Sequence, residues 1–298
     1  MADIKLFNIK GTVKEYQSGT VTLEKELQTV IENNMTTFFG VTFLASEFRT
    51  TDGGRMDSIG IDENHCPVIF EYKRSMKENV INQGLFYLNW LLDHKDSFKV
   101  LVIEKLGLKE ADNIDWTMPR VICVAGDFTK YDESAIKQMN RNISLIRYKK
   151  FGDDLLMFEQ VNENIADAIP EVESPITKAK VVYKTFDEQL ASADKAVKVL
   201  YQDLANYVLS LGDDISENHL KLYAAFKKIK NVITVVAQKK KLVINLPLDI
   251  ATVTFEEGFS RDVSGLGHWG CGAVELHLQN SADLEKAKVL IDRAYNEN

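Results

Sequence analysis

The chain has 298 residues, which is long enough for two domains of ordinary size. Its 45% hydrophobic and 27% charged residues are typical of a globular protein rather than a disordered one. The net charge of −8 argues against a general electrostatic nucleic-acid binder but leaves a local basic groove open.

Composition also bears on cellular location. No window approaches the roughly 18 apolar residues of a membrane span, so no membrane partner is expected. The N-terminus lacks the positive region and apolar core of a signal peptide. Cys66, Cys123 and Cys271 lie far apart and fit neither a disulfide framework nor a zinc site. We therefore expect a cytoplasmic protein.

The first half of the chain predicts a mixed sheet with flanking helices, an α/β fold. Residues 1–20 are expected to form an edge strand or arm, and apolar spacing predicts a helix from about Leu23 to Met35. Further helices are predicted at 79–94 and 132–140, and strands at 41–49, 98–103, 120–125, 143–148 and 155–161.

The second half predicts a smaller α+β domain. Residues 166–180, with two prolines and little periodicity, read as a linker between domains at 1–165 and 181–298. Beyond it we expect a long helix at 186–210 and a closing helix at 282–295, capped by Ser281. Strands are predicted at 223–229, 232–237, 241–246 and 274–278.

The stretch from Arg55 to Lys73 reads as two apolar strands joined by a turn at residues 63–66. Side chains alternate between the faces of a strand, so Glu71 and Lys73 share one face of the second strand, while Asp57 lies on the first. Apolar residues on both faces predict interior strands. Carboxylates and an ammonium are costly to bury there unless they are paired or hold a metal.

An Asp, a gap of 13 residues and then Glu-Tyr-Lys resembles the pattern of the PD-(D/E)XK nuclease superfamily. Asp57, Glu71 and Lys73 match that pattern residue by residue. Gln83 and Tyr87, four residues apart on a predicted helix, resemble the Gln-x-x-x-Tyr motif of the RecB-like branch. An upstream glutamate on the first helix is usual in the family, and both Glu24 and Glu26 are candidates.

The resemblance implies a restriction-endonuclease-like fold and a nuclease that depends on Mg²⁺ or Mn²⁺, with DNA as the expected substrate. Asp57 and Glu71, with Glu24 as the third ligand, would hold the ion, since hard cations prefer carboxylate oxygens. Lys73 would orient the attacking water or neutralise developing charge. Gln83 and Tyr87 would position the phosphate or the water by hydrogen bonds.

The alternative is a catalytically inactive binding or adaptor protein, because a fold does not specify an activity. Under that hypothesis the acidic residues bind no metal. The sequence also leaves a monomer and a homodimer open.

Several residues near the motif have ordinary structural interpretations. His65 and Cys66 are expected on a turn surface, and Trp90 in the core. Glu47 is either a further ligand or a strand-end charge, and we favour the latter. Arg55 and Arg74 are candidate phosphate contacts outside the motif. The lysines of 227–230 and 239–241 either follow a nucleic-acid backbone or, as is commoner, line a solvated strand edge.

The glycine-dense stretch 265–272, which includes His268 and Trp269, reads equally well as a binding loop or a tight bend. The second half resembles a C-terminal domain that follows PD-(D/E)XK-like domains in bacterial proteins labelled "predicted transport protein". The sequence offers transport no support, because it has neither a membrane span nor a phosphate-binding loop. We expect this domain to set the substrate or partner.

Overall fold

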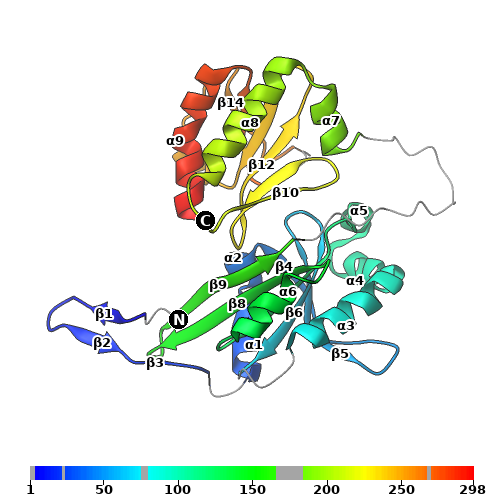
Figure 1. Cartoon of the computed structure of the whole chain (residues 1–298), viewed down its shortest axis with the longest axis vertical. Helices are drawn as coiled ribbons and strands as arrows, with labels where there is room; N and C mark the ends of the chain where they lie inside the picture. The colour runs from blue at the N-terminus through cyan, green and yellow to red at the C-terminus, as the bar shows by residue number, and fades with distance from the viewer. Residues whose placement is uncertain (1–3, 22–23, 75–79, 166–183, 267–269) are drawn as a thin grey trace. The chain divides into compact units, whose positions relative to one another are not determined.

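The computed structural model describes residues 4–21, 24–74, 80–165, 184–266 and 270–298 (Figure 1). The chain divides into two compact units. The first comprises Met1–Ile114 and Met118–Asp167, and the second comprises Asp115–Thr117 and Ala168–Asn298. The predicted linker at 166–180 lies outside the described residues.

The first unit is built on a seven-stranded mixed sheet. Its strand order is β3-β8-β7-β6-β5-β4, and β9 pairs with β8. The parallel pairs are β6–β7 and β7–β8, while β4, β5 and β6 are joined by antiparallel pairing. The strands are β3 (Ser18–Gly19), β4 (Val41–Arg49), β5 (Arg55–Asp62), β6 (Pro67–Lys73), β7 (Arg120–Ala125), β8 (Asn142–Phe151) and β9 (Leu155–Asn164).

The first unit also has a separate antiparallel ribbon at its N-terminal end. The strands β1 (Leu6–Asn8) and β2 (Lys14–Tyr16) pair with each other. In Figure 1 this ribbon extends away from the mixed sheet of its unit. Of the edge strand or arm expected over residues 1–20, residues 6–16 form a small hairpin, while β3 is a short edge strand of the mixed sheet.

Helices cover both faces of the mixed sheet. On one face Phe39 packs against Phe70 of β6 at a centroid distance of 5.3 Å. On the other face Gly84 lies so close to β7 that a Cβ there would meet Val121 Cγ1 at 2.4 Å. The helices are α1 (Glu24–Asn33), α2 (Met35–Phe39), α3 (Val80–Asp93), α4 (Lys95–Leu106), α5 (Leu108–Asp112) and α6 (Lys130–Ile136). The predicted α/β class is thus confirmed.

The prediction of a strand at 98–103 is wrong, because these residues belong to helix α4. Its β-branched residues favour a strand locally. In the folded chain Phe98, Leu101 and Val102 are buried together at helical spacing, while Val100 stays exposed. Packing of that stripe therefore overrides the local preference.

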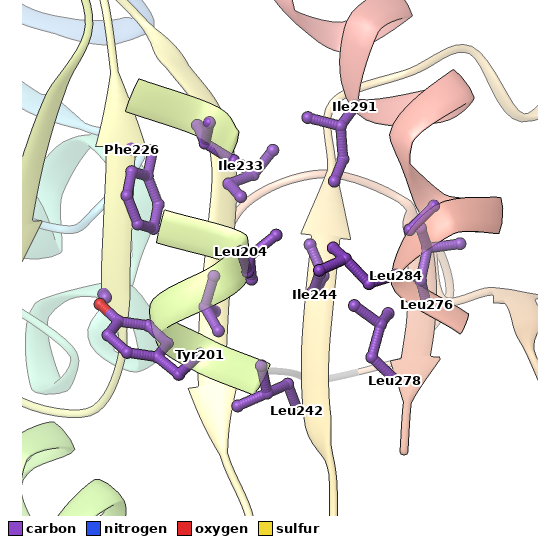
Figure 2. Packing of buried hydrophobic residues seen from close by; sticks show 14 of the residues in the cluster. Tyr201, Leu204, Phe226, Ile233, Leu242, Ile244, Leu276, Leu278, Leu284 and Ile291 are labelled. Carbon is purple, nitrogen blue, oxygen red and sulfur yellow. The ribbon is translucent and has the colours of Figure 1, made fainter. Parts of the chain in front are cut away.

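The second unit has a six-stranded antiparallel sheet in the order β10-β11-β12-β13-β15-β14. Helices α8 and α9 cover one face, where Tyr201 and Leu204 of α8 and Leu284 and Ile291 of α9 meet strand residues such as Ile244 (Figure 2). The strands are β10 (Ser216–His219), β11 (Ala224–Lys227), β12 (Asn231–Ala237), β13 (Leu242–Leu246), β14 (Ser260–Asp262) and β15 (Val274–Leu278). The helices are α7 (Phe186–Ser192), α8 (Lys195–Leu209), the 3-10 turn η1 (Ile250–Thr252) and α9 (Ser281–Glu297).

Two details of the second unit differ from the sequence prediction. The single helix expected at 186–210 is two helices, because Ala193 and Asp194 are extended and α8 begins at Lys195. The cap of α9 is Asn280 rather than Ser281, since the Asn280 side chain accepts the N–H groups of Ala282 and Asp283. Strands β10 and β14 were not predicted. They are short edge segments without a period-2 apolar pattern.

Within the described ranges, no helix is both long enough and apolar enough to cross a membrane.

The helical register of α4 predicts how two neighbouring substitutions differ. Phe98→Ala should lower the free energy of unfolding by about 3–5 kcal/mol, because Phe98 is fully buried. Val100→Ala should change it by less than about 0.5 kcal/mol, because 53% of Val100 is exposed. Urea unfolding of the two variants measures this. In a strand residues 98 and 100 would share a face, so comparable large losses would contradict the helix.

Candidate functional site

The strand pair β5–β6 carries the motif carboxylates and is held by a tight turn. Asp62 Oδ1 accepts the N–H groups of Asn64 and Cys66, both at 2.9 Å. The resulting register pairs Ser58 with Phe70 and Ile59 with Ile69. Asp57 and Glu71 therefore meet across the pair, on the sheet face that α3 covers. Glu71 shares a face with Ile69, two residues away, and Ile69 pairs with Val121, against which Gly84 of α3 packs.

Hydrogen bonds from the backbone connect the two carboxyl groups. The Asp57 N–H donates to Glu71 Oε1 at 3.3 Å, and the Tyr72 N–H donates to Asp57 Oδ2 at 3.0 Å. Each carboxyl group thus lies against the other residue's strand. The sequence placed the two residues on neighbouring strands, and the motif resemblance implied that they act together. The structure brings them together.

Burial makes this pair electrostatically costly. Glu71 is only 2% exposed, and burial, followed by the neighbouring Asp57 charge, raises the Glu71 pKa to about 9. Burial also raises the pKa of Asp57, although the Tyr72 N–H and the Lys73 charge act in the opposite direction. Cys123, beside Glu71 in the β6–β7 register, supplies no charge, because burial raises its thiol pKa as well.

Lys73 and Glu24 form the polar edge of the site. The Lys73 Nζ lies 4.0 Å from Glu24 Oε2, and the Arg74 N–H donates to Glu24 Oε1 at 3.0 Å. Glu26 instead lies beside Lys150 at 3.6 Å. Of the two upstream candidates, Glu24 is therefore the one that reaches the motif.

The carboxylates that meet at the site supply only part of the ligand shell of a hard divalent cation. Across the described residues, no group of three or more His, Cys, Asp or Glu side chains is arranged to hold a metal ion. Mg²⁺ is nevertheless commonly bound by one or two carboxylates, with waters and substrate phosphates completing its shell. Asp57 and Glu71 supply such a pair. A ligand role for Glu24 stays a prediction.

The two motif residues on α3 lie in different surroundings. Tyr87 is buried, and its hydroxyl accepts the Arg55 N–H at 3.2 Å. Gln83 is exposed on the same helix. Tyr87 thus holds the start of β5, while the positioning role of Gln83 stays a prediction.

A buried polar network on the other side of β5 was missed by the sequence reasoning. Gln28 Nε2 of α1 lies within hydrogen-bond distance of the Asp57 carbonyl (2.8 Å), Glu32 Oε1 (2.8 Å) and Ser46 Oγ (3.1 Å) and shares its two N–H groups among them. The Ser58 hydroxyl donates to the same Glu32 oxygen at 2.6 Å. The available signal was a glutamine placed beside Leu27 within the apolar stripe of α1.

The positions of His65, Cys66 and Trp90 agree only in part with those expected from the sequence. The expectation of a surface position is wrong for Cys66, which is buried. His65 is part exposed, with Nδ1 3.5 Å from Glu110 Oε2. Trp90 is a core residue as expected, stacked on His94 with its Nε1–H donating to Thr51 Oγ1 at 3.0 Å.

The lysine-rich segments of the second unit differ from each other. In the first, Lys227 is buried, and Lys228 Nζ donates to the Tyr295 carbonyl at 2.9 Å while lying over the Tyr295 ring. In the second, Lys239 and Lys240 are exposed in the turn between β12 and β13. Of the two segments, this turn is the more exposed, since Lys228 and Lys230 are only part exposed.

The described part of the glycine-dense stretch packs tightly on the sheet. The Cys271 N–H donates to Thr234 Oγ1 at 3.2 Å, and a Cβ on Gly270 would meet the same oxygen at 2.2 Å. Close by, the fully buried Asn245 amide has no hydrogen-bond partner at either polar atom among the described residues. His268 and Trp269, which suggested a binding loop, lie outside the described residues.

Comparison with known proteins places the whole chain in a family. A protein of Haemophilus influenzae described as "Uncharacterized protein" is 32% identical over 302 residues, covering 98% of this chain and 99% of that protein. The chain belongs to the same family as this protein. Residues 186–298 also match the family described as "Domain of unknown function (DUF5655)".

Among solved structures, a repair endonuclease from Pyrococcus abyssi is similar at 20% identity and a TM-score of 0.29. The aligned part covers 43% of this chain and 49% of that one, so the chain spans about half the length of the endonuclease. At this TM-score the likeness does not establish a shared fold.

The raised Glu71 pKa predicts how stability depends on pH. Between the ordinary value of 4.5 and about 9, the unfolded chain ionises Glu71 while the folded chain keeps it protonated. Stability therefore falls as pH rises through this window, and Glu71→Gln removes that loss.

Without metal, the Tm of Glu71→Gln should equal that of the wild type near pH 5 and exceed it by several degrees near pH 8. Each kcal/mol of difference in the free energy of unfolding corresponds to roughly 2–4 °C in Tm. Differential scanning calorimetry in EDTA measures this. A Tm difference that stays constant across the pH range would contradict the proposed buried, protonated state.

Proposed function

We propose that the protein is a metal-dependent phosphodiesterase that cleaves nucleic acid, with DNA as the expected substrate. The observation that carries this proposal is the meeting of Asp57 and Glu71 inside the sheet, with burial opposing the negative charge on both. A bound divalent cation would offset that charge, and the pair provides the oxygen ligands that Mg²⁺ or Mn²⁺ takes. The motif resemblance supports the same function.

The residues have distinct parts in this proposal. Asp57 and Glu71 would hold the ion, which when bound polarises a phosphate and lowers the pKa of a water molecule. Lys73, with its ammonium near Glu24, would neutralise charge that develops on the phosphate or orient the attacking water. Tyr87 positions Asp57 indirectly by holding Arg55, and the exposed Gln83 would contact substrate.

A non-catalytic nucleic-acid-binding or adaptor protein is the second candidate. It is favoured by the lack of a three-residue metal cluster within the described ranges. The two candidates differ in metal binding, because a ligand of the folded state raises the Tm. The catalytic proposal expects Mg²⁺ or Mn²⁺ to raise the Tm of the wild type but not that of Glu71→Gln.

The catalytic proposal predicts cleavage of labelled single- or double-stranded DNA that requires Mg²⁺ or Mn²⁺ and stops in EDTA. Asp57→Asn, Glu71→Gln and Lys73→Met should each lower kcat/KM by about 10²-fold or more, because each removes a group that acts at the phosphate or the metal. Gel or fluorescence assays of initial rates measure this.

Lys99→Met is the matched control for Lys73→Met. Lys99 lies on the surface of α4, paired with Asp112 at 2.9 Å, so the control should cleave like the wild type. Circular dichroism and Tm show whether each variant is folded. Folded variants that retain full activity would contradict the assigned site. The absence of both cleavage and a metal-induced rise in Tm would favour the adaptor candidate.

A further inference from the structure

Glu47 has an unusual backbone conformation for its place in the fold. It lies inside β4, between Ser46, which pairs with Ser58, and Phe48, which pairs with Met56. Its φ is +55°, in the left-handed region that non-glycine residues rarely adopt. Such strain persists where the surroundings impose it and is frequent at functional sites. The structure thus replaces the strand-end charge favoured from the sequence with a strained residue inside a strand.

The Glu47 carboxylate holds two basic side chains from different elements. Its Oε2 lies 2.7 Å from Arg55 Nε at the start of β5, and its Oε1 lies 3.2 Å from Lys25 Nζ on α1. The side chains of Lys25 and Arg55 are 58% and 59% exposed. Exposed ion pairs contribute little to stability, so they do not by themselves account for a strained backbone.

The same group is connected to the motif residues. Lys25 Nζ donates to Gln28 Oε1 at 3.2 Å, and Gln28 Nε2 donates to the Asp57 carbonyl at 2.8 Å. Arg55 precedes Asp57 by two residues, and its N–H donates to Tyr87. Glu47 is near enough for its charge to act on the Asp57 carboxyl group. The two cations therefore lie at the edge of the site rather than on a separate surface.

We propose that Lys25 and Arg55, held in place by Glu47, form a binding subsite for a backbone phosphate that flanks the cleaved phosphodiester. This inference rests on the proposed function. Glu47 occupies the Nε side of the guanidinium, so the exposed remainder of Arg55 can present its Nη groups to phosphate oxygens. Glu47 offsets only one of the two positive charges of Lys25 and Arg55, so these three side chains together carry a charge of +1.

Salt dependence of DNA binding tests the subsite, because each phosphate contact by a cation contributes about one unit to the slope of log K against log salt. The measurements use Asp57→Asn as the background, so that DNA is bound without being cut, in Mg²⁺ between about 50 and 200 mM salt. Adding Lys25→Gln or Arg55→Gln should weaken binding several-fold and reduce the magnitude of the slope by about 1. Lys99→Gln, with the same change of charge on α4, should leave both unchanged.

The variant Glu47→Gly distinguishes a role of Glu47 in positioning Lys25 and Arg55 from the effect of its negative charge on DNA binding. Glycine adopts a φ of +55° without strain, so the strand should keep its Tm. Removing a negative charge near DNA would by itself strengthen binding. Weaker binding by this variant would therefore show that Glu47 positions the two cations. Unchanged or tighter binding would overturn that part of the inference.

The outcomes distinguish this inference from the proposed function. If the Asp57→Asn protein binds DNA and Lys25→Gln and Arg55→Gln alter the slope no more than Lys99→Gln does, the subsite is wrong and the proposed function stands. If the Asp57→Asn protein binds no DNA at any salt concentration tested, both fail. In the active protein, Lys25→Gln and Arg55→Gln should raise KM more than they lower kcat, as expected for a binding contact.

Discussion

Two carboxyl groups meet inside the mixed sheet of the first unit, and the surrounding structure supports them. Glu71 lies on β6, which has a parallel neighbour on one side and an antiparallel neighbour on the other. Removing two such groups from water is costly, and the cost grows when they are adjacent. The N–H groups of Asp57 and Tyr72 offset part of it. The remainder appears as the raised pKa values of both side chains.

The two faces of the sheet support this pair in different ways. On one face α1 supplies polar contacts, in which Gln28 and Glu32 bind the backbone of Asp57 and the hydroxyl of Ser58. On the other face α3 approaches β7 at Gly84 and holds the start of β5 through Tyr87. The strand that carries Asp57 is thus fixed from both sides. Such rigidity is what a site needs to hold reacting groups in position.

The second unit has a different construction. Its core is apolar, with α8 and α9 packed on one face of an antiparallel sheet (Figure 2). Polar residues lie in a row across the strands, where Thr234 pairs with Asn245, Asn245 with Glu275, and Glu275 with Arg261. The similarity to the Haemophilus influenzae protein covers both units, so the two occur together on one chain in this family.

Much of this structure follows from local patterns in the sequence. Apolar residues on both faces of two segments joined by a turn identified β5 and β6, and the strand period of two put Glu71 and Lys73 on one face. The motif resemblance implied that Asp57 acts with them. Most other strands were predictable for the same reason. Tertiary packing decided the segment at 98–103, where burial of a helical stripe outweighed β-branched residues, and the break at Ala193, after which a new helix begins at Lys195.

Tertiary structure also decided which carboxylate reaches the motif and what Glu47 does. Glu24 and Glu26 differ little in sequence context, but only Glu24 is directed toward Lys73 by the placement of α1. The left-handed backbone of Glu47 and its contacts with Lys25 and Arg55 arise where three separate elements meet. The sequence determined which residues could do chemistry, because strand and helix periods are local. The fold determined which of them meet, because distances between elements depend on packing across the whole unit.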